Sequence, residues 1–187
     1  MIVYIAGDVT LFNKKTLELM KNNIIIKKEP WVNYLYTNCY SYALNLDIPY
    51  YAYNSWKENQ INPYNVGTIS DKLKMIQTND ELYDAFMSDC KLLNIEVLEV
   101  DPEYNKLLDD EWLVALYNQI GYDISDFHFI KKDCYRNWLG KDGYTFNISN
   151  EDHFENVIIN PKKAKFGDAQ DGLYEYIGTY KLKKLVR

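Results

Sequence analysis

Cys39 and His128 are the residues whose types and surroundings point most directly to chemistry. Cys39 follows Thr37 and Asn38, which are good helix-capping residues, so the sequence predicts a thiol at the start of a helix. The aligned N–H groups at such a position lower a thiol pKa from about 8.5 toward the range of reactive cysteines, about 3.5 to 7.5. Nucleophilic catalysis also needs a base, and the chain has two histidines, His128 and His153.

His128 lies in the segment DFHFI, residues 126–130, whose alternation is typical of a strand. Phe127 and Phe129 share one face of that strand, and His128 lies on the other. A base on a strand that faces a thiol on a helix suits thiol hydrolysis. The structural alternatives are that Cys39 is a small buried apolar residue and that His128 packs within the fold.

Other polar clusters offer weaker chemistry. Cys90 and Cys134 are expected to be structural. Cys39, Cys134, His128 and His153 lack the close spacing of metal ligands, so we expect no metal site. The sequence also lacks the glycine-rich motifs that hold phosphates, and no cofactor is expected.

Several short blocks resemble a known family. Residues 38–44 (NCYSYAL) resemble the NCYxYAL signature of papain-like cysteine hydrolases related to the NlpC/P60 group. Residues 126–133 (DFHFIKKD) and 137–143 (NWLGKDG) are similar to the DxHFxRxD and WSHKxG blocks of bacterial and phage relatives. The blocks occur in family order across residues 36–182, and residues 1–35 have no counterpart. The sequence shows no internal repeats, low-complexity tracts or linkers, so we expect one domain over residues 1–187. The resemblance implies that residues 36–182 are a papain-like core that follows an N-terminal extension, residues 1–35.

The resemblance implies an α+β fold in which the nucleophile helix packs on an antiparallel sheet. It also implies that Cys39 attacks an amide carbonyl, and that His128 serves as base and then acid while water releases the acyl-enzyme. The substrate would be a peptide or a cell-wall peptide. The backbone N–H of Cys39 and a donor from Tyr34 or Tyr36 would form the oxyanion hole. The residues expected to bind substrate are Tyr36, Asn38, Gly67 and Trp138.

The sequence departs from the family at Gly140. The relatives carry a second histidine there, which orients the base. We take Asp142 as the replacement orienter, with Asn137 and His153 as alternatives.

Loss of that histidine supports a second hypothesis, a catalytically idle scaffold. Such a protein, from a phage or mobile element, would bind and inhibit a host factor. The chain has 18 tyrosines, a residue enriched at interfaces. Acyl transfer is a third possibility, because it would use the same cysteine and histidine.

Composition limits the classes of partner. The 187 residues are 47% hydrophobic and 26% charged, as in a soluble globular domain, and the net charge of −6 argues against binding nucleic acid. Residues 79–112 hold eleven acids against two lysines, whereas the last seven residues carry four positive charges. We expect two solvated faces, the alternative being that the acidic one is a decoy for a DNA-binding partner. The sequence shows neither a secretory signal nor an 18-residue apolar stretch, so we expect a cytoplasmic protein that does not bind membranes.

The local patterns predict the elements that position these residues. Thr78 and Glu81 have the spacing of a capping box and predict a helix after residue 78. Strands are expected at 2–6, 95–100, 112–117, 127–132 and 135–139, with 112–117 central, a turn at 140–143 and an edge strand at 174–186. A further helix is expected at 13–21 and a long loop at 50–70.

Overall fold

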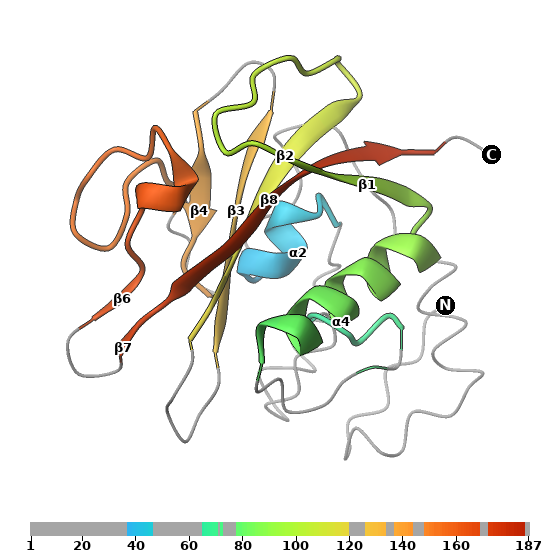
Figure 1. Ribbon diagram of the computed structural model, residues 1–187, viewed down its shortest axis with the longest axis horizontal. Coiled ribbons are helices and arrows are strands. Elements are labelled where there is room, and N and C mark those ends of the chain that lie inside the picture. Colours follow the sequence, from blue (N-terminus) through green and yellow to red (C-terminus); the bar gives the residue numbers. More distant parts are fainter. Residues whose placement is uncertain are drawn as a thin grey trace.

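The computed structural model describes residues 37–46, 65–70, 72, 78–119, 126–133, 137–143, 148–168 and 172–185 (Figure 1). Its helical elements are α2 (Cys39–Ala43), α4 (Asn79–Leu92) and the 3₁₀ helix η3 (Pro161–Lys163). Its strands are β1 (Ile95–Val100), β2 (Glu111–Asn118), β3 (Phe127–Asp133), β4 (Leu139–Lys141), β5 (Ile148–Ser149), β6 (Gly167–Asp168), β7 (Gly172–Leu173) and β8 (Glu175–Lys184). The described residues include no helix long and apolar enough to cross a membrane.

Six strands form one sheet in the order β1-β8-β2-β3-β4-β5, and every neighbouring pair is antiparallel. All eight residues of β2 are buried, because this strand lies between β8 and β3 and is covered on both faces. The prediction that 112–117 is a central strand is confirmed. The predicted strands at 95–100 and 127–132 are confirmed as β1 and β3.

Alternation along β2 divides the apolar side chains between two cores. Trp112, Val114 and Leu116 belong to a first core that also contains side chains of α2 and α4. Figure 1 shows these two helices next to each other beside the sheet. Leu113, Ala115 and Tyr117 point the other way, into a second core that the segment 158–166 covers.

The two main helices begin at capping boxes. The Thr78 side chain accepts a hydrogen bond from the Glu81 N–H, and the Glu81 carboxylate accepts one from the Thr78 N–H, as predicted. Asn38 and Ser41 form the same reciprocal pair at α2. The predicted cap and start of the helix at Cys39 are therefore confirmed.

Asp89, on the inner face of α4, joins three segments of the chain. Its carboxylate accepts hydrogen bonds from the Tyr40 hydroxyl at 2.8 Å, the Gly67 N–H at 2.7 Å and the Ser70 N–H at 2.7 Å. Burial raises the pKa of this carboxyl. Asp89 and Glu111 are both buried, so the prediction of a uniformly solvated acidic face across 79–112 is wrong at these two positions.

The predicted fold class, an α+β papain-like or NlpC/P60-like fold with the nucleophile helix packed on an antiparallel sheet, is wrong. The described residues form mostly antiparallel sheet, and α4 is the one helix among them with seven or more residues. The helix that carries Cys39 has five residues. It ends early because the chain turns at Asn45, whose φ of 56° is incompatible with a continuing helix.

Two predicted boundaries in the sheet also need correction. Gly140 and Lys141, expected in a turn after a strand at 135–139, lie inside β4, where Gly140 pairs with Ile130 of β3. The predicted edge strand at 174–186 is β8, which lies in the interior of the sheet between β1 and β2. The predictions for 2–6, 13–21 and most of 50–70 fall outside the described residues.

Candidate functional site

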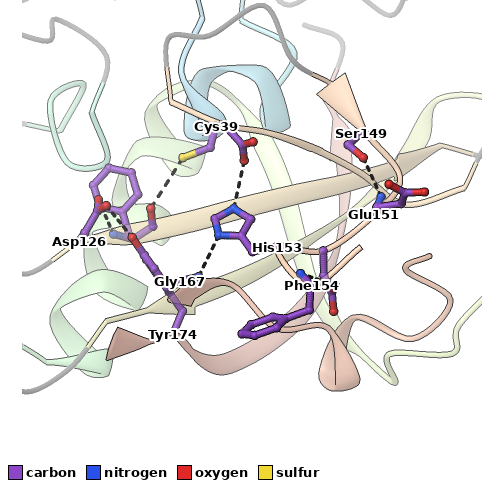
Figure 2. Close-up of polar contacts among 11 residues, drawn as sticks. Cys39, Asp126, Ser149, Glu151, His153, Phe154, Gly167 and Tyr174 are labelled. Atoms are coloured by element: carbon purple, nitrogen blue, oxygen red, sulfur yellow. Dashed lines mark hydrogen bonds and ion pairs between the residues drawn. The ribbon is translucent and has the colours of Figure 1, made fainter. Parts of the chain in front are cut away.

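Cys39 is the first residue of α2, and its side chain lies inside the first core. It is 5% exposed and packs in the same cluster as Tyr40 and Phe129. The thiol donates a hydrogen bond to the Phe127 carbonyl oxygen, with 3.8 Å between sulfur and oxygen. A dashed line from the Cys39 sulfur marks this contact in Figure 2. Burial raises the pKa of the thiol to about 12, so Cys39 is a neutral thiol at physiological pH.

His128 is buried in the second core. Its side chain is 6% exposed, and its ring lies 4.3 Å from the Phe166 ring and 6.3 Å from the Tyr117 ring, measured between centroids. Its Nε2 atom has no hydrogen-bond partner among the described residues. Burial lowers the pKa of His128 to about 4, so the imidazole is neutral at physiological pH.

These two side chains pack on opposite faces of β3. Phe129 lies in the same core as Cys39, whereas Ile130 lies in the core that surrounds the His128 ring. Alternation along the strand places His128 on the Ile130 face. The hydrogen bond of Cys39 goes to Phe127, and the described residues show none between the thiol and His128. The structure therefore does not bring the expected nucleophile and base into contact.

Asp142 and His153, two of the candidate orienters, contact each other. Asp142 Oδ1 lies 3.2 Å from His153 Nε2, and the Gly167 N–H donates to His153 Nδ1 at 3.0 Å (Figure 2). Because Nδ1 accepts, the neutral ring carries its proton on Nε2 and donates it to Asp142. The hydrogen bond to Asp142 raises the pKa of His153. The rings of His128 and His153 are 5.8 Å apart between centroids.

Gly140 lies beside the unpartnered nitrogen of His128. A Cβ at this position would be 3.4 Å from His128 Nε2 and 3.1 Å from Ile130 Cγ2. A side chain at position 140 would therefore contact the imidazole, and glycine leaves it without a partner there. The third candidate orienter, Asn137, is exposed.

Three of the four expected substrate-binding residues make contacts that hold the fold together. The Asn38 side chain caps α2 and donates to Asn65 Oδ1 at 3.0 Å. Gly67 has a φ of 85° and donates its N–H to Asp89. Trp138 is buried in the second core. Tyr36 and the alternative oxyanion donor Tyr34 fall outside the described residues.

Lys141 is a buried charged residue that sequence analysis missed. Its ammonium donates to the Gly143 carbonyl oxygen at 2.9 Å, and burial lowers its pKa to about 8. Burial raises the pKa of the Cys39 thiol, and the positive charge of Lys141 opposes this rise to a smaller extent. Asp142, the next residue, contacts His153. No local signal marked the burial of Lys141, because the surrounding glycines favoured a turn.

A surface pocket is the second feature that the sequence did not indicate. It has a volume of about 360 Å³ and is lined by Glu103 and by residues of the segment 152–165. Glu103 follows β1, whereas the segment lies between β5 and β6, so the pocket joins parts of the chain about fifty residues apart. The described residues contain no group of three or more His, Cys, Asp or Glu placed to hold a metal ion.

Comparisons of the chain with protein-family models, with curated proteins and with solved structures found no match. The resemblance to the NlpC/P60 group therefore stays a prediction from short sequence blocks.

Proposed function

We propose that the protein acts by binding a protein or peptide partner, and that Cys39 and His128 serve its stability rather than covalent catalysis. The observation that carries this proposal is the position of the thiol, which is 5% exposed in an apolar core and hydrogen-bonded to a backbone carbonyl.

Thiol catalysis has requirements that this arrangement does not meet. A nucleophilic cysteine needs its thiolate form and a base within hydrogen-bond reach, about 2.6 to 3.2 Å or looser in a free enzyme. With a pKa of about 12 for Cys39, the thiolate fraction at pH 7 is on the order of one molecule in 10⁵. An attacking sulfur would also have to leave the first core, which opposes the reaction further.

Exposed apolar side chains support a binding role. Ile159 is 83% exposed, Val157 is 52% exposed and Phe154 is 50% exposed, all within one segment between β5 and β6. Apolar side chains gathered on a surface and bordered by charged groups are typical of sites that contact other proteins. Here the border includes Lys163 and Lys165, which line the pocket together with Val157 and Ile159.

Thiol hydrolysis is a second candidate, favoured by one observation. His153 is partly exposed and its Nε2 contacts the Asp142 carboxylate, the kind of contact that orients a catalytic histidine in cysteine and serine hydrolases. Its Nδ1 would have to release the Gly167 N–H before it could accept a proton. For this candidate, His153 rather than His128 would serve as the base, and the Cys39 thiol would have to become accessible.

Affinity capture from a bacterial lysate tests the binding role. We expect the wild-type chain and Cys39→Ala to retain the same protein in equal amounts, because the thiol makes no surface contact. Ile159→Glu should reduce capture about tenfold or more, because it places a charge in the exposed apolar patch, and its fold should be unchanged. Quantitative mass spectrometry of the bound fraction provides the measurement.

The result that would contradict the binding role is equally specific. It is the absence of any protein whose capture falls with Ile159→Glu, or a capture that depends on Cys39 and is covalent. Circular dichroism of both variants provides the control for folding.

A further inference from the structure

The backbone of the segment that lines the pocket beside η3 is held in place by hydrogen bonds to the Asp152 side chain. Asp152 accepts hydrogen bonds from the Phe154 N–H at 2.9 Å, the Asn156 N–H at 3.0 Å and the Lys165 N–H at 3.0 Å. The buried Asp152 carboxylate therefore links residues 154–156 to residue 165, at the two ends of the segment that lines the pocket. At about 360 Å³ the pocket falls within the usual range of ligand sites, about 300 to 1,000 Å³.

The acidic groups of the pocket are already engaged. The carboxylate of Asp152 is occupied by the backbone donors of its own segment. Glu103 Oε1 accepts from Asn160 Nδ2 at 2.9 Å, which joins the two walls. Glu103 and Asp152 both keep their negative charge, because hydrogen bonds from neutral N–H groups do not remove it. Any anionic group of a ligand must therefore lie on the side of the lysines.

The basic groups of the pocket are free. Lys163 and Lys165 are both exposed, and the described residues show no ion pair to either ammonium. The Lys165 ammonium lies 5.9 Å from the centre of the Phe154 ring, a contact that leaves its donors available. The arm 163–165 is therefore locally positive, while the whole lining, with Glu103 and Asp152 against Lys163 and Lys165, carries no net charge.

The apolar and basic groups together define the ligand. Val157 and Ile159 line the same pocket as the two lysines, and both are exposed. Resting on the binding role proposed above, we infer that this pocket takes a peptide segment of a partner protein that carries both apolar side chains and carboxylates. The apolar side chains contact Val157 and Ile159, and the carboxylates pair with Lys163 and Lys165.

Fluorescence anisotropy with three labelled peptides of equal length tests this assignment. One peptide alternates Glu with Leu, one alternates Lys with Leu, and one alternates Glu with Ser. We expect the Glu–Leu peptide to bind about tenfold or more tightly than the other two, because only this peptide satisfies both the lysines and the apolar side chains. Its affinity should also fall as salt is added.

Matched variants separate the pocket from general surface charge. Lys163→Glu should weaken Glu–Leu binding about tenfold, whereas Lys162→Glu should change it less than about twofold, because Lys162 is exposed but does not line the pocket. Ile159→Ser should weaken binding through the apolar contact. Glu103→Gln should tighten it, because a like charge is removed.

Three results would overturn the assignment. They are no preference for the Glu–Leu peptide, equal losses with Lys162→Glu and Lys163→Glu, or a dimer of this chain that Lys163→Glu abolishes while the peptide stays unbound. Capture of a lysate protein that persists in Lys163→Glu would reject this pocket and leave the general binding role intact.

Discussion

Replacing Asp89 by alanine is expected to lower the free energy of unfolding by about 3 to 5 kcal/mol. The variant leaves the buried Tyr40 hydroxyl and the N–H groups of Gly67 and Ser70 without their acceptor. It also removes the side chain that links α4 to α2 and to the turn at 65–70. Urea unfolding followed by tryptophan fluorescence measures the loss.

Two further variants show whether the hydrogen bonds cause this loss. Asp84→Ala removes an exposed carboxylate from the same helix and should change stability by less than about 0.5 kcal/mol. Asp89→Asn keeps the shape of the side chain but has one acceptor oxygen, so its loss of stability should lie between those of Asp84→Ala and Asp89→Ala. An Asp89→Ala variant within about 1 kcal/mol of the wild type would contradict the described role of Asp89.

His128→Phe is expected to make the protein resistant to acid. Burial lowers the pKa of His128 to about 4 in the folded state, whereas an unfolded histidine has a pKa of about 6.5. Between these values the unfolded chain binds a proton that the folded chain does not, so stability falls as the pH falls from about 6.5 to about 4. At pH 4.5 the loss attributable to His128 is about 2.5 kcal/mol.

Phenylalanine cannot take the proton, and it also removes the unpartnered Nε2 atom. We therefore expect His128→Phe to gain about 1 kcal/mol at pH 7 and more at pH 4.5, where the wild type is weakened. Urea unfolding of both proteins at the two pH values gives the comparison.

His153→Gln serves as the control of opposite sign. Asp142 raises the pKa of His153, so the stability that His153 contributes is present below about pH 6.5 and is lost as the pH rises through its folded value. Its removal should therefore make the protein more sensitive to acid than the wild type, the opposite of the effect expected for His128→Phe. The same pH dependence in His128→Phe as in the wild type would show that His128 is not buried in its neutral form.

Local signals in the sequence were sufficient for several elements. The Thr78 and Glu81 spacing specifies a cap through contacts within one turn, and the apolar run at 112–117 specifies a strand buried on both faces. Elements that depend on distant partners were not predictable in this way. β4 exists because Gly140 pairs with Ile130, and β8 is interior because β1 pairs along its free edge.

The candidate site shows the same limit. The alternation of DFHFI correctly separated His128 from Phe127 and Phe129, but no local pattern told which face α2 covers. The structure places Cys39 on the phenylalanine face, so the thiol and the imidazole are apart. The surface pocket was also beyond sequence analysis, because it forms only when Glu103 meets the segment 152–165.

Alkylation of Cys39 by iodoacetamide, followed by mass-spectrometric mapping between pH 6 and 8, most directly tests whether the thiol is structural. With its pKa at about 12, native Cys39 should react about 1,000-fold or more slowly than the same residue in urea, and its rate should be unchanged in His128→Phe and His153→Gln. Rapid native alkylation at or below pH 7, slowed by either histidine substitution, would contradict the account and support a thiol hydrolase.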